Sequence, residues 1–233
     1  MVRWMTVCAL LLVCSATALA QDEFDDGIFG GGFMLGWLTL PTVSEINDVL
    51  TVNGYAALPE AMLTFGGGGY AGDVLGLRLG GRGGSGEATA VRGEKAVKLE
   101  LGFGGLMLEY GVFATEAADV AAGVTLGGGE ATLSLRAHQP GTFEDAVASP
   151  TNTVLTRGFF LVQPHLSLEV LLGFFKARVY GSYVLTFAEP WMQRGVELHG
   201  PPSAFRGWSV ELLLTFGMAF ASDEPKPKPP AGK

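Results

Sequence analysis

Three side chains that could do chemistry alternate along one stretch of the chain: His165, Ser167 and Glu169. A histidine beside a serine can activate the hydroxyl as a nucleophile. Residues two apart on a strand are about 6.5–7 Å apart along it, however, so the spacing alone does not give a Ser–His hydrogen bond. A buried polar network would use the same groups, with Glu169 paired to Arg178 and His165 facing Ser182. We expect the network, and catalysis is the weaker alternative.

Other residue patterns that could bind a cofactor or a metal are weak. Gly67-x-Gly69-x-x-Gly72 has the lettering of a dinucleotide-binding loop. That loop must be followed by a helix, whereas the residues that follow here alternate like a strand. His138 and His199 fall in predicted loops without the spacing of metal ligands. The sequence therefore predicts no cofactor and no metal.

The chain begins with the features of a secretory signal peptide over residues 1–20. Arg3 supplies the positive charge, residues 7–13 form the apolar core, and Ala-Leu-Ala precedes a cleavage site at Gln21. A transmembrane helix is disfavoured because the apolar run is too short. A lipoprotein anchor at Cys14 is disfavoured because the residue before it is not small. Both cysteines lie in this leader, so the exported chain would contain no disulfide and no cysteine-based site.

The composition excludes several classes of protein. Glycine makes up 35 of the 233 residues, about twice the usual ~7%, but it follows no three-residue period, so collagen is excluded. A positive mean hydropathy excludes a disordered chain. Without the leader, 14 basic and 23 acidic residues give a net charge of −9, and no basic cluster exists to bind nucleic acid. We interpret the glycines as markers of tight turns.

The dominant hydrophobic period is two, which is typical of strands. Apolar residues change phase across the glycines at 104–105 and at 127–129. We interpret both changes as hairpin turns, with a bulge in one long strand as the alternative. The ten predicted strands are 31–40, 60–66, 73–81, 95–103, 106–113, 119–127, 130–137, 154–172, 176–187 and 207–221.

Only one stretch has helical spacing. Thr42-x-x-Glu45 is a capping-box pattern, apolar residues follow at helical intervals, and Gly54 is placed to end the helix. The sequence predicts a short helix at about 43–53, inside a connection. Long and short connections alternate along the chain, and we expect function to lie in the long ones. These are near 41–59, 82–94, 138–153 and 188–206.

Together these features predict an all-β fold, a closed antiparallel up-and-down transmembrane β-barrel of about ten strands, with eight as the next choice. Outer-membrane barrels have an even number of alternating strands of about ten residues, with tight turns at one end and longer loops at the other. Lipid offers no partner for an open strand edge, so the sheet must close on itself. The predicted segments are an acidic leader at 21–30, the barrel at 31–221 and a disordered Pro/Lys-rich tail at 222–233.

The polar faces of the predicted strands would point into the barrel. Because the alternate faces are apolar, we expect them to meet lipid and the polar residues to pair with one another inside. Arg78 and Lys98 are also predicted to point inward. The predicted lumen network consists of Gln163, His165, Ser167, Glu169, Arg178, Tyr180 and Glu211.

Over residues 31–221 the chain resembles bacterial outer-membrane β-barrel proteins in architecture. Thr215, Gly217 and Phe220 are similar to the end of such barrels, although Ser222 stands where a final aromatic residue is expected. The resemblance implies that the barrel-assembly machinery and the lipid bilayer are partners. The stretch 44–72 resembles a segment of uncharacterised exported bacterial proteins.

The His-x-Ser spacing is similar to that of outer-membrane phospholipases. Those enzymes also need a positioning amide residue, and no Asn or Gln follows at a suitable distance on the next strand.

Three functions follow as hypotheses. The first is an integral outer-membrane protein that is not an enzyme and is structural or passes small solutes. The second is a soluble exported β-sandwich or barrel, periplasmic or secreted, that binds a partner or an apolar ligand. The third is a lipid-modifying barrel enzyme. The oligomeric state is left open.

Overall fold

The computed structural model describes residues 26–115, 117–137, 152–172, 175–201, 204–216 and 219–221. The predicted signal peptide, the tail and most of the acidic leader lie outside these residues. The described strands and the one helix are, in order, β1 (Asp26–Thr39), α2 (Val43–Val52), β2 (Ala61–Asp73), β3 (Leu77–Arg92), β4 (Lys95–Ala114), β5 (Ala118–Arg136), β6 (Asn152–Leu172), β7 (Phe175–Ala188), β8 (Trp191–Gln193), β9 (Val196–Leu198), β10 (Arg206–Phe216) and β11 (Ala219–Ala221).

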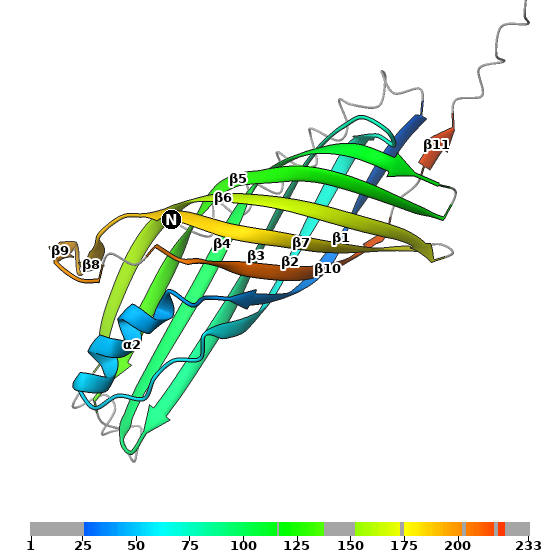
Figure 1. Ribbon diagram of the computed structural model, residues 1–233. Coiled ribbons are helices and arrows are strands. Elements are labelled where there is room, and N and C mark those ends of the chain that lie inside the picture. Colours follow the sequence, from blue (N-terminus) through cyan, green and yellow to red (C-terminus); the bar gives the residue numbers. More distant parts are fainter. Residues whose placement is uncertain are drawn as a thin grey trace, which may run out of the picture.

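The strands form one antiparallel sheet that closes on itself (Figure 1). The order around the ring is β1, β2, β3, β4, β5, β6, β7 and β10, and β10 returns to β1 with Phe216 opposite Gly31. β11 continues this pairing along β1, and β8 and β9 form a hairpin outside the ring. The prediction of a closed antiparallel barrel is therefore confirmed. The ring has eight strands, so the alternative count is correct and the count of ten is wrong.

The two surplus strands came from hairpin turns that do not exist. Predicted strands 95–103 and 106–113 are one strand, β4, and predicted strands 119–127 and 130–137 are one strand, β5. Gly104 pairs with Gly128, and Gly105 pairs with Gly127, in the middle of an unbroken ladder. The predicted loop 82–94 is likewise strand, apart from the two residues that join β3 to β4.

The phase change that suggested turns has another cause. Odd-numbered residues of β4 face inward from Val97 to Gly111, where the register with β5 shifts, and these include both Leu99 and Glu109. Even-numbered residues face outward, and these include both Glu100 and Leu108. The inside is thus apolar at one end of the barrel and polar at the other, and the outside has the opposite arrangement. β3 and β5 show the same inversion.

The two ends of the barrel differ in their connections. At the end that carries both ends of the ring, tight turns join β2 to β3 and β4 to β5, and only two residues separate the paired ends of β6 and β7. Helix α2 lies in the connection at the opposite end, where the sequence predicted it. Gly54 follows it with a positive φ of 77°, as expected of a helix stop. The predicted capping box is wrong, because Thr42 makes no side-chain cap hydrogen bond.

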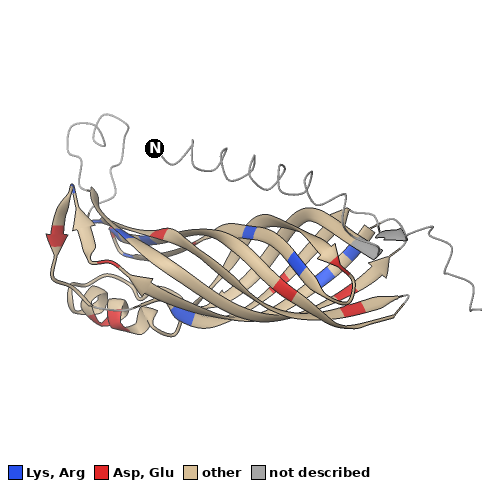
Figure 2. Cartoon of the chain, turned by 90° about the horizontal axis from the view of Figure 1, so that it is seen from above, with Lys and Arg blue, Asp and Glu red and all other residues tan. Residues whose placement is uncertain are grey.

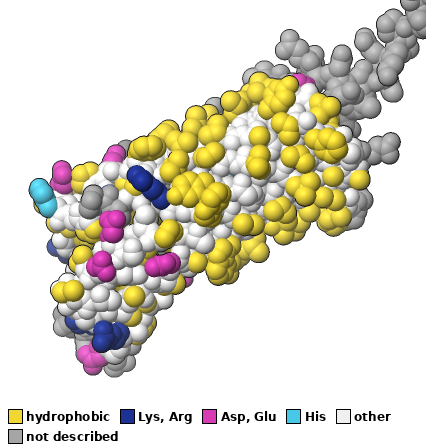
Figure 3. Space-filling view, viewed as in Figure 1, with side chains coloured by type: hydrophobic (Ala, Val, Ile, Leu, Met, Phe, Trp, Pro, Cys, Tyr) yellow, Lys and Arg dark blue, Asp and Glu magenta, His cyan; other side chains and the backbone are white. Residues whose placement is uncertain are grey.

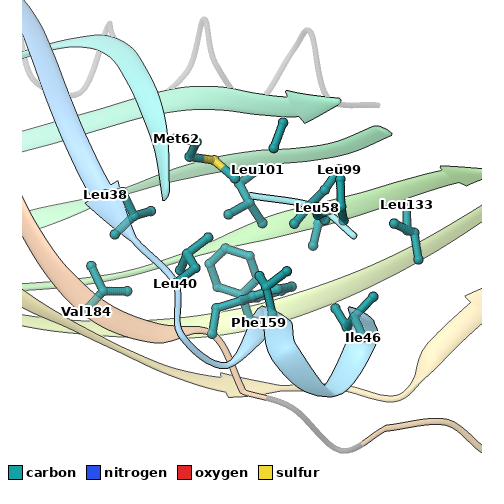
Figure 4. Close-up of a cluster of buried hydrophobic side chains, with 14 of the residues drawn as sticks. Leu38, Leu40, Ile46, Leu58, Met62, Leu99, Leu101, Leu133, Phe159 and Val184 are labelled. Atoms are coloured by element: carbon teal, nitrogen blue, oxygen red, sulfur yellow. The ribbon is translucent and has the colours of Figure 1, made fainter. Parts of the chain in front are cut away.

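Beyond β1 and β2, four strands continue as a rim extension, defined as residues 87–92, 95–101, 130–136 and 152–158. Its inner face is apolar and packs against Val43, Ile46 and Leu50 of α2 (Figure 4). We call these buried side chains the apolar plug. Its strand contributors include Leu38, Met62, Leu99, Leu101, Leu133, Phe159, Leu161 and Trp191, and Leu40 joins them from the connection that follows β1.

The outer surface of the ring carries an apolar band. Figure 3 shows hydrophobic side chains over the body of the barrel, with nearly all visible charged ones at the end that carries α2. Phe33 is 78% exposed and Leu106 is 74% exposed. The band also includes Leu35, Leu63, Phe65, Leu79, Leu108, Leu126, Phe160, Leu166, Leu168, Val179, Phe187, Val210, Leu212 and Leu214. Within the described residues, no helix is long and apolar enough to cross a membrane.

Glycine within the strands permits close approach of neighbouring backbones. A Cβ on Gly127 would overlap the carbonyl oxygen of Gly104, whereas a Cβ on Gly102 would have no atom within 4 Å. We therefore predict that Gly127→Ala destabilises the folded barrel by roughly 1–3 kcal/mol, the usual cost of overpacking. Gly102→Ala is the matched control and should leave stability nearly unchanged. Urea unfolding in detergent micelles measures both, and equal midpoints for the two variants would contradict the explanation.

Candidate functional site

The inward positions nearest the tight turns carry buried ionisable side chains. Figure 2 marks where acidic and basic residues occur along the strands. We call the buried group the charge network. All its members are less than 9% exposed, and its four cations and four carboxylates balance. They are Arg78, Arg82, Lys176 and Arg178 with Glu109, Asp119, Glu169 and Glu211. A fifth buried arginine, Arg157, lies apart from them and donates to the backbone oxygen of Glu189.

The end of the network near the tight turns is held by two ion pairs. Arg78 Nη1 lies 2.8 Å from Asp119 Oδ1, and Lys176 Nζ lies 3.0 Å from Glu169 Oε1. Tyr70 donates its hydroxyl to the other oxygen of Glu169. These contacts join β2, β3, β5, β6 and β7, so they brace the ring across its interior.

Arg178 occupies the centre of the network. Its Nη2 lies 3.0 Å from Glu109 Oε2, and its Nε lies 3.9 Å from Glu169 Oε2. Its guanidinium stacks 4.2 Å from the ring centroid of Tyr70 and 5.3 Å from that of Tyr180. The predicted register, with Glu169 opposite Arg178, is confirmed. The nearest carboxylate is nevertheless that of Glu109.

The next layer is built around Arg82 and Glu211. Arg82 Nη1 lies 2.8 Å from Glu211 Oε2, and Arg82 Nε donates to Thr125 Oγ1 at 2.8 Å. The second oxygen of Glu211 accepts from Gln163 at 2.7 Å and from Ser209 at 2.8 Å. Both atoms of the carboxylate are therefore paired, as a buried charge requires.

His165 connects these two layers. Its Nε2 lies 2.9 Å from Glu109 Oε1, and its Nδ1 lies 3.2 Å from Arg82 Nη2. Its Nδ1 also lies 3.2 Å from the backbone oxygen of Gln163, so this nitrogen faces both a donor and an acceptor. His165 thus bridges an arginine and a carboxylate. Gly123 leaves room for it, because a Cβ there would lie 2.8 Å from Nε2.

The possible catalytic arrangement of His165, Ser167 and Glu169 is not assembled. Ser167 donates to the backbone oxygen of Ala121 at 3.4 Å, and no hydrogen bond joins it to His165 in the part of the chain that the structure describes. His165 lies opposite Ser182 in the ladder, as predicted, but Ser182 accepts from Gln163. The three groups serve separate parts of the network.

The predicted lumen residues all point inward. Gln163, His165, Ser167, Glu169, Arg178, Tyr180 and Glu211 are buried in the lumen, as is Arg78. Lys98 was predicted to point inward and does not. It lies on the outer face of the rim extension, where its Nζ is 2.7 Å from Glu87 and 3.0 Å from Glu100.

Sequence reasoning missed Tyr70, Arg82, Glu109, Asp119 and Lys176. Arg82 was assigned to a loop. Glu109 alternates with the apolar residues Leu108 and Tyr110 of predicted strand 106–113, and this local alternation is the signal that would have put Glu109 inside.

Little open space remains inside the barrel. An apolar cavity of about 20 Å³ lies beneath α2, lined by Leu38, Leu40, Leu101, Phe103, Phe159, Leu161, Val184 and Phe205. That volume suffices for about one water molecule. The described residues contain no group of three or more His, Cys, Asp or Glu side chains placed to hold a metal ion.

Fold and site together define a closed eight-stranded antiparallel barrel with a filled interior, polar at one end and apolar at the other. No protein-family model matches the chain, and no curated protein sequence is significantly similar to it.

We predict that Arg82→Met strongly destabilises the barrel, by about 3–5 kcal/mol, because it leaves Glu211 charged and buried without its cation. The double variant Arg82→Met with Glu211→Met should recover much of that loss. Lys98→Met, which removes an exposed ion pair on the outer face, is the control and should change little. Urea midpoints followed by tryptophan fluorescence measure the three. A double variant no more stable than the single one would contradict the assigned pairing.

Proposed function

We propose that the chain is an integral outer-membrane β-barrel protein without enzymatic activity, which anchors its rim extension at the cell surface. The single observation that carries this proposal is the apolar band on the outside of a closed ring. A soluble barrel buries its apolar side chains inside, whereas here large apolar side chains are exposed around the ring and charged ones are enclosed. This inversion is typical of a barrel whose outer face contacts lipid and whose interior is polar.

The height of the band supports the same proposal. On β6 the outward apolar positions run from Phe160 to Val170. Ten steps of ~3.3 Å, tilted by about 45°, cover roughly 23 Å, close to the ~25 Å band of outer-membrane barrels. Trp37 and Trp208 are exposed at the end of the band nearest α2. Indole rings favour the boundary between lipid and water.

The filled interior favours the function of an anchor rather than that of a channel. A solute would have to displace both the charge network and the apolar plug. In barrels of this kind the tight turns face the periplasm and the longer connections face outward. We therefore place α2 and the rim extension outside the cell. Among the alternatives, a soluble ligand-binding barrel does not account for the apolar band, and a lipid-modifying enzyme would need the His165–Ser167 contact.

Two matched arginine substitutions test the membrane proposal. Leu108→Arg places a charge within the apolar band, and Thr132→Arg places one on the outer face of the rim extension. We predict that Leu108→Arg disfavours insertion by about 2–4 kcal/mol near the bilayer midplane and that Thr132→Arg has almost no effect. Folding into lipid vesicles, read by heat-modifiable gel mobility, measures the difference.

The control for this test is the unaltered protein in isolated envelopes. It should stay in the membrane fraction after carbonate washing and leave only with detergent. Release by carbonate, or equal folding of the two arginine variants, would overturn the proposal and favour the soluble alternative.

Conductance separates an anchor from a channel. We predict no stepwise current when the purified protein is added to a planar lipid bilayer, because the charge network and the apolar plug fill the lumen. Leu50→Ser, which weakens the plug, should leave the bilayer silent as well, since the charge network remains. Regular single-channel steps from the unaltered protein would instead support passage of small solutes.

A further inference from the structure

We propose that the free edge of β3 in the rim extension binds an extended segment of another polypeptide as an added antiparallel strand. This inference rests on the proposed function only in placing the edge outside the membrane. It names what the anchored extension would recognise. The edge comprises residues 88–92, with the sequence Ala-Thr-Ala-Val-Arg.

β3 loses one of its two neighbours at this point. Its ladder with β4 continues from Leu77 to Arg92, but its ladder with β2 ends where Gly86 lies opposite Thr64. No backbone hydrogen bond from the described residues reaches the outer edge of 88–92. Leu58, in the connection between α2 and β2, does not form such a bond. Its N–H and C=O are both hydrogen-bonded to the side chain of Asn47.

The direction of the free backbone groups follows from the paired part of β3. A Cβ on Gly66, Gly68 or Gly72 of β2 would meet a carbonyl oxygen of an odd-numbered β3 residue. Odd-numbered residues of β3 therefore direct their N–H and C=O toward β2, since these groups alternate along a strand. Beyond Gly86 the same alternation leaves Thr89 and Val91 with both groups on the open edge.

The opposite edge of the rim extension is covered. Met192 of β8 pairs with Thr156 of β6, Arg157 donates to the backbone oxygen of Glu189, and the Trp191 ring lies 5.0 Å from the Arg157 guanidinium. Uncovered edges are usually shortened, bulged or interrupted by proline. The β3 edge has none of these features, and it alternates small and β-branched residues that favour pairing.

The charges at the two ends of the edge set the direction and chemistry of the partner. At the tip, Arg92, Glu94 and Lys95 carry a net charge of +1, and the Lys95 ammonium also donates to the backbone oxygen of Asn53 at 2.7 Å. At the base, Glu87 and Glu100 share one ammonium group, that of Lys98, which leaves an excess negative charge. An incoming antiparallel strand has its N-terminal end at the tip and its C-terminal end at the base. A matching segment is thus acidic at its N-terminal end and basic at its C-terminal end.

A second copy of this chain does not fit the edge. Copies inserted the same way in one membrane are related by an axis along the membrane normal. Such an axis leaves the two β3 strands parallel and turns the apolar inner faces of the two extensions to opposite sides. The edge therefore suits a segment of a different polypeptide. Strand addition to an exposed sheet edge is an established mode of peptide recognition, in which main-chain hydrogen bonds supply the affinity.

The test uses the full chain in detergent micelles and a fluorescent probe peptide. The probe alternates valine and threonine, with aspartate at its N-terminus and lysine at its C-terminus. A second probe of the same sequence is N-methylated on alternate residues of one edge, and a third has the two charges exchanged. Fluorescence anisotropy should show saturable binding of the first probe, about tenfold weaker binding of the third, and no binding of the N-methylated one.

The matched variants are Thr89→Pro and Thr89→Ala. Proline removes an outward N–H without removing a donor from the β3–β4 ladder, so binding should weaken about tenfold. Alanine keeps the backbone donor and should bind like the unaltered protein. Equal binding of the N-methylated probe, no binding of the first probe, or an unaffected Thr89→Pro variant that still shows the folded gel band would each overturn the inference. If the chain proves soluble, the same probes can be used without detergent. Failure of the membrane proposal can therefore be distinguished from failure of the peptide-binding proposal.

Discussion

Alternation of side chains along an unbroken strand is the constraint on which the rest of this structure depends. Once the ring closes through β1 and β10, each residue's face is fixed by its parity, and no strand can exchange its faces without a turn or a bulge. A strand that continues from the rim extension into the part of the ring with the apolar band must therefore change the residue types on both of its faces where the two parts meet. β4 does this, with Leu99 and Glu109 on the same inner face.

Enclosing eight ionised side chains is costly unless each finds a partner, because desolvation of a buried ion costs several kcal/mol. The charge network meets this condition by equal numbers of opposite charges and by bridging side chains such as His165, which lies between Arg82 and Glu109. The result joins strands far apart in the sequence, such as β3 and β10 through Arg82 and Glu211. The same contacts fill the lumen, so support of the ring and closure of the lumen have one physical origin.

The sequence predicted the features that depend on local pattern. Alternation gave the strands, the inward side of β6 and β7, and the opposition of Glu169 and Arg178 across a tight turn. It failed where glycine and a phase change coincided, at 104–105 and 127–129. A hairpin turn and a change of surroundings along one strand both shift the apolar residues between odd and even positions, so the sequence pattern does not distinguish them. The partners of the central arginine could not be found either. Glu109 reaches Arg178 from β4, and residues that meet across a lumen have no characteristic separation in the sequence.

The division of the interior also limits where recognition can occur. The charge network closes the half of the barrel near the tight turns, and the apolar plug under α2 closes the other half, so neither end leads into an open chamber. What remains available is the outside, and most of that is the apolar band. The rim extension is the part of the ring with a polar outer face, as Glu87, Lys98 and Glu100 show. Of its two edges, β8 covers one, so specific contacts with a partner in water are concentrated on the other, along β3.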